Sequence, residues 1–161
     1  MVISKTYKTE TAHIVRNAYS TRCKFNVHGH SYKWIVHIRG EVNKKTGMVI
    51  DFGNLKSVKQ FIDQFDHTMV LWKDDDPDFI QFFKSNVKRL IIMNKNTTAE
   101  NMAALVYKFV DSWLKEEYMP KTYVEMEYRV DKVEVWETET GRAIAASCDE
   151  NDTITYKQIE E

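Results

Sequence analysis

Cysteine is scarce in this chain, with Cys23 and Cys148 the only two among 161 residues. Two thiols cannot supply the disulfide framework that stabilises small secreted proteins, so the fold must rest on a hydrophobic core. Apolar residues make up 43% of the sequence, which is enough for the core of one domain. The sequence therefore favours a reducing compartment, and we expect a cytoplasmic protein.

An excess of charge of one sign is also missing, as are long hydrophobic runs. The chain carries 23 basic and 24 acidic residues, which argues against a protein that binds nucleic acid through its phosphates. Residues 1–10 contain no apolar signal segment, and no stretch approaches the roughly 20 apolar residues that cross a bilayer. We expect a small-molecule partner, with neither nucleic acid nor membrane.

Internal repeats, low-complexity segments and linkers are absent too, so residues 1–161 are predicted to form a single domain. The stretch 72–96 stands out because an acidic run and Pro77 interrupt regular structure. It is interpreted as an insertion or a lid, with a short amphipathic helix within 79–93.

Alternation of residue types predicts strands over 1–14 and about 27–40, with His13 near the end of the first. His28 and His30 share one parity with Tyr32 and Trp34 and should point the same way. A turn over 41–47 then predicts a returning strand at 48–52. Further strands are expected over 122–138 and 142–147, with a marginal polar tail after Asp149.

Two amphipathic helices are predicted between these strands. Asn54 can cap the first, whose apolar residues recur at helical spacing and stop just before Asp66-His67. Thr97 and Glu100 spell a capping box ahead of the second, over 102–114, and need no catalytic role. Strand pairs followed by helices indicate an α+β fold whose free sheet edges would invite oligomers.

Three histidines carry the strongest chemical signal. His28 and His30 lie two apart on one strand around Gly29, and His13 comes from another strand. Three imidazoles with a fourth position open describe a catalytic zinc site. The alternative is that they are ordinary strand histidines. His37 has the opposite parity and is excluded from the set.

Three other positions could take part in the same chemistry. Cys23 lies five positions before His28, where a nearby cation would favour its thiolate form, although a lone cysteine is more often a small buried hydrophobe. Asp66 could orient and stabilise the imidazole of His67, or simply be a solvated residue at a helix end. Glu137 has the parity of buried strand residues and would need a partner there, unless a register slip places it in solvent.

Seven motifs in order resemble the 6-pyruvoyl-tetrahydropterin and 6-carboxytetrahydropterin synthase family. They are Thr11-Ala12-His13, Cys23, His28-Gly29-His30-Ser31-Tyr32, Gly47-Met48-Val49-Ile50-Asp51-Phe52 with Leu55-Lys56, Asp66-His67, Thr98-Ala99-Glu100-Asn101 and Trp136-Glu137-Thr138. The resemblance implies the tunnelling fold, a four-stranded antiparallel sheet with two helices on one face. Subunits of that fold join their sheets into a barrel, as trimers and usually hexamers.

By the pattern of this family, His13, His28 and His30 would bind zinc. Cys23 would be the catalytic thiolate, and Asp66 with His67 its proton-transfer partners, commonly across a subunit boundary. Glu137 would anchor the pterin ring, assisted by Thr98.

The implied substrate is 7,8-dihydroneopterin triphosphate. The Ile50-Asp51-Phe52 spelling is more similar to the branch that forms 6-carboxy-5,6,7,8-tetrahydropterin and releases triphosphate and acetaldehyde, in queuosine biosynthesis. The alternatives are the 6-pyruvoyl branch, which only eliminates triphosphate, and a non-enzymatic pterin-binding protein.

Overall fold

A long antiparallel pair of strands forms the centre of the fold in the computed structural model, which describes residues 1–121, 127–147 and 153–160. Strand β1 (Val2–His13) pairs with β2 (His28–Gly40) along its whole length, from Val2 opposite Arg39 to His13 opposite His28. Side chains alternate between a buried and an exposed face, as the sequence pattern predicts. Both predicted strands are therefore confirmed.

The sheet has seven strands in the order β6-β5-β2-β1-β3-β4-β7. The remaining strands are β3 (Thr68–Trp72), β4 (Arg89–Met93), β5 (Tyr128–Trp136), β6 (Arg142–Ala145) and β7 (Tyr156–Glu160). Because β3 is parallel to both β1 and β4, the predicted four-stranded antiparallel sheet is wrong in strand number and direction. The apolar runs at 68–72 and 89–93 have the composition of parallel strands buried on both faces.

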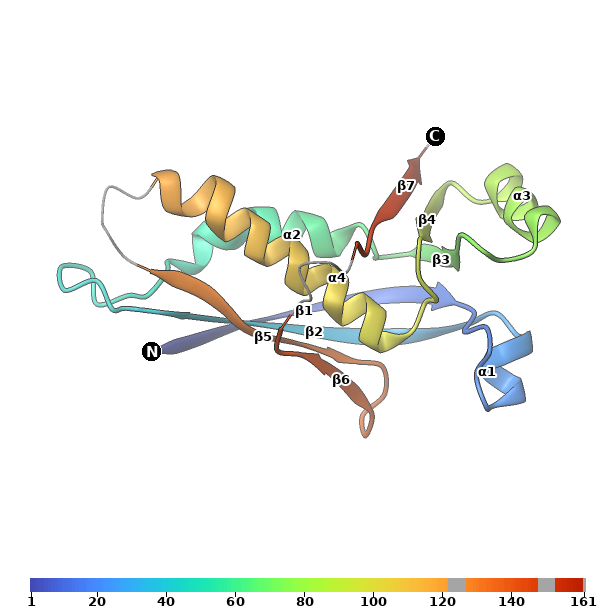
Figure 1. Ribbon diagram of the computed structural model, residues 1–161, viewed down its shortest axis with the longest axis horizontal. Helices are drawn as coiled ribbons and strands as arrows, with labels where there is room; N and C mark the ends of the chain where they lie inside the picture. The colour runs from blue at the N-terminus through green and yellow to red at the C-terminus, as the bar shows by residue number, and fades with distance from the viewer. Residues whose placement is uncertain (122–126, 148–152, 161) are drawn as a thin grey trace.

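The described residues contain four α-helices: the two predicted on one face of the sheet, one that confirms the short helix predicted within 79–93, and a short one over Thr21–Phe25 that was not predicted (Figure 1). They are α1 (Thr21–Phe25), α2 (Lys56–Asp63), α3 (Pro77–Asn86) and α4 (Ala99–Ser112), with short 3-10 turns η1 (Phe52–Leu55) and η3 (Met119–Lys121) and a π turn η2 (Trp113–Tyr118). Helices α2 and α4 pack on one face over the main core. Helix α3 packs on the other face of β3 and β4, against alternate strand residues that include Met69, Leu71 and Leu90. The stretch 72–96 thus links β3 through α3 to β4, and its status as an insertion stays a prediction.

Two helix starts differ from the prediction by a few residues. Asp51, not Asn54, caps the turn that leads into α2, and its side chain accepts from the Gly53 N–H. Thr98, not Thr97, caps α4 and accepts from the Asn101 N–H. Thr97 is instead fully buried, with its hydroxyl donating to the Ile14 carbonyl at 2.7 Å. The predicted capping box is therefore wrong, because Glu100 then stands two residues after the cap rather than three.

Two strand predictions fail because of the edges available for pairing. Residues 48–52 form no strand, since β2 is already paired with β1 on one edge and with β5 on the other. The polar tail, in contrast, contains β7, which pairs with the free edge of β4. Backbone pairing at an open edge does not require an apolar sequence.

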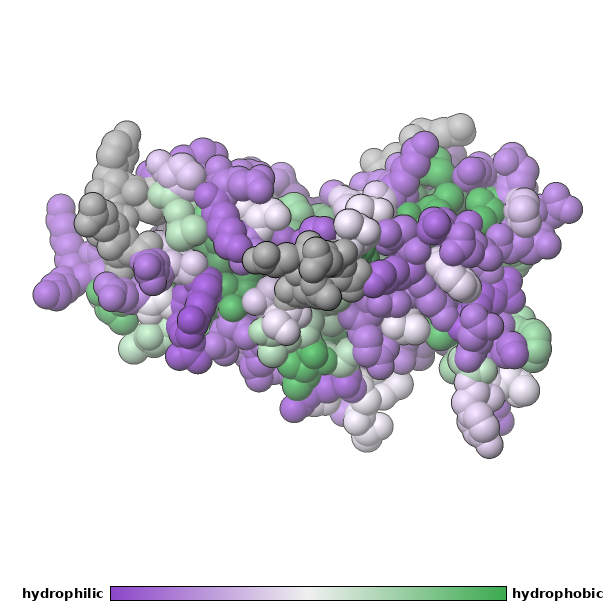
Figure 2. Space-filling view, in the orientation of Figure 1, coloured by the Kyte–Doolittle hydropathy of each residue, from purple (hydrophilic) through white to green (hydrophobic). Residues whose placement is uncertain are grey.

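Hydrophilic residues cover most of the face shown in Figure 2, and hydrophobic ones gather in smaller patches over β6 and beside β4 and α3. Within the described part of the chain, no helix combines the length and the apolar composition needed to cross a membrane.

Candidate metal centre and the two adjoining hollows

Strand register brings the three predicted histidines together. His13 lies directly opposite His28 at one end of the β1–β2 pair, and His30 is two residues further along β2 on the same face. Their ligand atoms all lie within 4.8 Å of one another, which is a cluster that could hold a metal ion. The intervening Gly29 fits closely, because a Cβ there would lie 3.2 Å from the Thr11 carbonyl oxygen.

Hydrogen bonds to the backbone orient two of the three rings. Nδ1 of His13 lies 2.8 Å from the Thr97 carbonyl oxygen, and Nδ1 of His28 lies 3.0 Å from that of Asn26. A carbonyl accepts only from an N–H, so both rings keep the Nε2 lone pair for a ligand. These two Nε2 atoms are 3.1 Å apart, close to the roughly 3.3 Å expected of two imidazole nitrogens on one tetrahedral zinc.

The third ring has a buried nitrogen to satisfy. His30 Nε2 is buried and has no hydrogen-bond partner within the described residues. A buried nitrogen of this kind is costly unless it is paired or bound to a metal. The residues present therefore fit a zinc ion held by three histidines.

Burial favours the neutral, metal-binding form of two of these imidazoles, His13 and His30. It lowers the pKa of His13 to about 4, although the hydrogen bond to Thr97 and the nearby Glu137 carboxylate both act in the opposite direction. Burial also lowers the pKa of His30. At neutral pH, protons therefore compete little with a metal for His13 and His30.

A buried tyrosine holds the predicted carboxylate beside this centre. Tyr32 is fully buried, and its hydroxyl donates to Oε1 of Glu137 at 2.9 Å. The same oxygen lies 3.4 Å from His13 Nε2 and 3.7 Å from His30 Nε2. Burial, and then the charge of Glu137, raise the pKa of Tyr32, so it remains a donor. The slip that would place Glu137 in solvent does not occur, since its side chain is 31% exposed and faces the histidines.

A cavity of about 340 Å³ opens next to His28. Its polar lining comprises Cys23, Thr98, Glu100, Glu137 and Arg142. Cys23 lies on α1, and its carbonyl accepts from the Val15 N–H at 3.1 Å, which folds α1 back beside β1. The thiol, the carboxylate and one metal-site imidazole thus line one space, whose volume is in the range of small-molecule sites.

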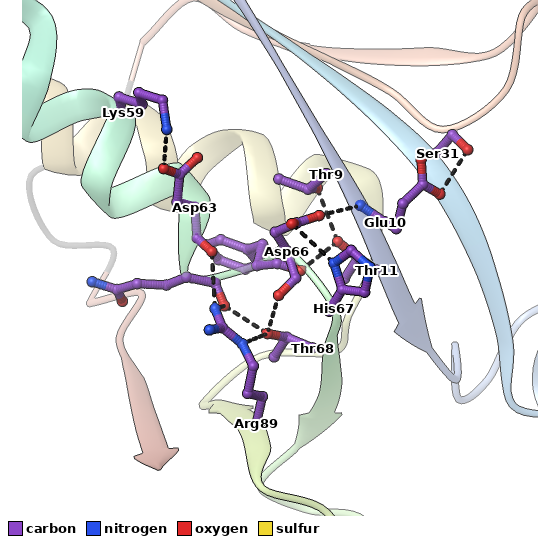
Figure 3. A network of polar contacts seen from close by, with 12 residues as sticks. Thr9, Glu10, Thr11, Ser31, Lys59, Asp63, Asp66, His67, Thr68 and Arg89 are labelled. Carbon is purple, nitrogen blue, oxygen red and sulfur yellow. Dashed lines mark hydrogen bonds and ion pairs between the residues drawn. The ribbon is translucent and has the colours of Figure 1, made fainter.

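The Asp66–His67 pair lies elsewhere, at the entry to β3 (Figure 3). His67 has a φ of 53°, a left-handed bend that brings its Nδ1 to 2.9 Å from Asp66 Oδ2. The other oxygen of Asp66 accepts from the Glu10 N–H at 2.8 Å, which is the main reason that the pKa of this carboxyl is lowered. The pair is thus fixed to the edge of β1, while the His67 ring is 75% exposed.

His67 lines a different hollow from Cys23. This recess of about 530 Å³ also contains His30, Glu10, Met69 and Phe83, whereas the cavity with Cys23 contains His28. The three histidines therefore lie between two hollows, with the predicted thiolate in one and the predicted imidazole in the other. The resemblance implies such a separation, since it places the pair commonly across a subunit boundary from the thiolate.

Sequence reasoning also left three neighbours of this centre without a role. Tyr32 shares the parity of His28 and His30, and that signal could have placed it beside them. Glu100, interpreted only as a capping residue, lines the cavity. Thr97 contributes through its backbone carbonyl, which no sequence pattern could reveal.

The exclusion of His37 is confirmed. Its ring faces the Glu134 carboxylate at 3.1 Å on the other side of β2, and it is not part of the histidine cluster.

Comparisons with known proteins agree on one family. The family described as 6-pyruvoyl tetrahydropterin synthase matches residues 2–148. A curated 6-carboxy-5,6,7,8-tetrahydropterin synthase from Helicobacter pylori strain J99 is 33% identical over 144 residues, which is 89% of this chain and 71% of that protein. The protein of the same name from Rickettsia felis is 35% identical over 122 residues, covering 74% of this chain and 82% of that protein.

Solved structures show the same fold. An uncharacterised protein from Wolinella succinogenes superimposes with a TM-score of 0.72 at 22% identity, covering 91% of this chain and 98% of that one. The 6-pyruvoyl tetrahydropterin synthase of Caenorhabditis elegans gives a TM-score of 0.61 at 25% identity, covering 91% of this chain and 95% of that one.

Proposed function

Because the chain belongs to the 6-pyruvoyl tetrahydropterin synthase family, we propose that it converts 7,8-dihydroneopterin triphosphate to 6-carboxy-5,6,7,8-tetrahydropterin, with release of triphosphate and acetaldehyde. It is a lyase of the tetrahydropterin synthase type, and zinc dependence and a place in queuosine synthesis are part of the proposal. The observation that carries it is the cluster of three imidazoles beside a cavity that also contains a thiol and a carboxylate.

His13, His28 and His30 would hold the zinc through their Nε2 atoms. Zinc bound there would supply Lewis-acid stabilisation of negative charge on the side-chain oxygens of the substrate. The protein's own contribution is to fix two of the rings through the carbonyls of Thr97 and Asn26. Fixed rings keep the site assembled between turnovers.

Glu137 would orient the substrate. With Oε1 held by the Tyr32 hydroxyl, its other oxygen is left to accept from the aminopyrimidinone edge of a pterin, which presents parallel N–H donors. Thr98 lines the same cavity and would assist. Glu100 offers a second carboxylate in that lining and becomes a rival anchor for the ring.

Proton transfer would involve Cys23, His67 and Asp66. Asp66 fixes the ring of His67 through Nδ1 and leaves Nε2 to exchange protons. Since Cys23 and His67 line different hollows of one chain, we place their meeting at a subunit boundary. The open edge of β1 supports such a homo-oligomer, because β1 pairs with β3 only over Thr11–His13.

The 6-pyruvoyl branch remains the alternative product. The names of the curated relatives and the Ile50-Asp51-Phe52 motif favour the carboxy branch. The free thiol of Cys23 is compatible with the cytoplasmic location that we propose.

Product identification by mass tests this function. Zinc-loaded protein is incubated with 7,8-dihydroneopterin triphosphate, and the expected products are triphosphate, acetaldehyde and the 6-carboxy pterin. Cys23→Ala should abolish turnover, whereas Cys148→Ala, the matched control, should not. A 6-pyruvoyl product without acetaldehyde would select the alternative branch, and no consumption by metal-loaded protein would reject both.

A further inference from the structure

Arg16 connects the segment that carries Cys23 to the β3–α3–β4 unit. Its Nε donates to Asp75, which lies between β3 and α3, and one terminal nitrogen donates to the Lys24 carbonyl in α1 at 3.3 Å. The guanidinium carbon also lies 5.0 Å from the centre of the Phe79 ring on α3. One side chain thus contacts both α1 and the unit packed beside it.

Asp75 is buried at its contact with Arg16, unlike its neighbours in the acidic run at 74–76, which are exposed. Its side chain is 1% exposed, and its second oxygen accepts from the Trp72 N–H at 3.3 Å. The side chain of Asp74 is 54% exposed, and its carboxylate lies 3.4 Å from Lys73 Nζ. Asp76 caps α3. A buried carboxylate needs a charged or hydrogen-bonding partner, and here the partner is Arg16.

The backbone of Arg16 is fixed from the metal side. Its N–H donates to the Asn96 side chain at 3.1 Å, and that side chain also accepts from the Thr97 N–H at 3.0 Å. Thr97 in turn holds the ring of His13. The backbone of Arg16 is therefore hydrogen-bonded to the segment that orients His13, and its guanidinium is hydrogen-bonded to α1. Arg16 thus sets where α1 lies relative to the metal centre.

We propose that Arg16 and Asp75 are positioning residues that hold the Cys23 thiol at its place in the cavity beside His28. The β3–α3–β4 unit then acts on the active site through Asp75. The inference rests on the proposed role of Cys23 in proton transfer. Loss of the contact leaves the histidine cluster intact but allows α1 to move, and a misplacement of about 1 Å can cost up to about a hundredfold in rate.

The test uses zinc-loaded protein in a Cys148→Ala background, where Cys23 is the sole thiol. Asp75→Asn keeps the shape and removes the charge, Arg16→Gln removes the other partner, and Asp74→Asn is the matched control. We expect kcat for 7,8-dihydroneopterin triphosphate to fall about tenfold with KM within about twofold. Alkylation of Cys23 by iodoacetamide should become severalfold faster, with zinc content unchanged.

Coupling between the two residues separates positioning from general destabilisation. The double variant Arg16→Gln/Asp75→Asn should be no slower than the worse single variant, because both changes break one contact. If Asp75→Asn does not fold, Arg16→Lys serves instead, since a single ammonium cannot reproduce the guanidinium contacts with both α1 and Asp75.

Folded variants with wild-type kcat and wild-type alkylation rates would overturn the inference, as would equal effects of Asp74→Asn. If the parent protein shows no turnover at all, the proposed function fails, and the alkylation rate of Cys23 alone tests the positioning role. Faster alkylation in Asp75→Asn then still supports the positioning role, and an unchanged rate rejects it.

Discussion

The metal centre and the Asp66–His67 pair are built in opposite ways. In the candidate metal centre His13 is fully buried, His28 and His30 are half-buried, and the ring of His13 is fixed by the Thr97 carbonyl. His67 is 75% exposed and is fixed only by its neighbour Asp66. One chain therefore contains all three proposed metal ligands, whereas the proposed proton-transfer pair faces a hollow without Cys23. We infer that Asp66 and His67 complete the site of a second copy of the chain.

The largest effect is expected at the metal centre. His28→Ala removes one of three ligands and should abolish both zinc binding and turnover. His37→Ala is the matched control, because it lies on the same strand but faces Glu134, and it should retain zinc. Metal analysis and product assay of both variants check this. Full zinc content in His28→Ala would show that the cluster is not the metal site.

Loss of the exposed imidazole should be severe but should spare the metal. His67→Asn is expected to lower kcat by roughly 10²-fold to 10⁴-fold, the usual contribution of a positioned acid or base, with zinc content unchanged.

Mixing two inactive proteins tests the subunit boundary. If His67 serves the Cys23 of another copy, refolding Cys23→Ala together with His67→Asn should restore part of the activity, because mixed assemblies contain an intact pair. No recovery, despite proven mixed assembly, would place both residues in one chain's site.

Tyr32→Phe should have an intermediate effect. It removes the hydroxyl that holds Glu137 and should lower the free energy of unfolding by about 1.5–3 kcal/mol, the usual contribution of a hydrogen bond to a charged group. Tyr7→Phe is the control, since the Tyr7 hydroxyl is buried without a hydrogen-bond partner in the described part of the chain. Its loss should be neutral or stabilising. Denaturant titration of both variants measures the difference.

The anchoring carboxylate can be identified by the same logic. Glu137→Gln and Glu100→Gln are isosteric changes in one cavity. The true anchor should raise KM more than tenfold, since a charge-assisted pair of hydrogen bonds contributes about 1.5–3 kcal/mol. We expect this of Glu137, and steady-state kinetics of the two variants decide between them.

The metal-free protein should also show a pH dependence of stability. Burial lowers the pKa of His13 to about 4, and also lowers the pKa of His30 and His37. Between about pH 4 and 6.5 the unfolded chain therefore binds more protons, so stability should rise with pH and level off above about 6.5. Unfolding titrations across this range check the sign, and His13→Gln should flatten the slope.

The sequence was informative where periodicity decides the outcome. The parity of His28 and His30, and the strand end at His13, predicted a cluster that the β1–β2 register produces. The left-handed residue His67 supplies the bend that a direct bond to Asp66 requires, and no periodic pattern predicts that conformation.

Long-range pairing was beyond a local pattern. The acidic run at 74–76 was interpreted only as a break, yet Asp75 is buried against Arg16, 59 residues earlier in the chain. Strand β7 joins the sheet because β4 has a free edge, and the polar sequence of β7 does not predict this pairing. The number of strands and the position of α3 depend on such long-range contacts, which a local sequence pattern does not contain.

X-ray absorption at the zinc edge, with metal analysis, tests the central claim most directly. The account predicts one zinc per chain, with only nitrogen or oxygen neighbours at about 2.0–2.1 Å, three of them imidazoles. A sulfur neighbour at about 2.3 Å would make Cys23 a ligand rather than a proton-transfer group, and would contradict the account.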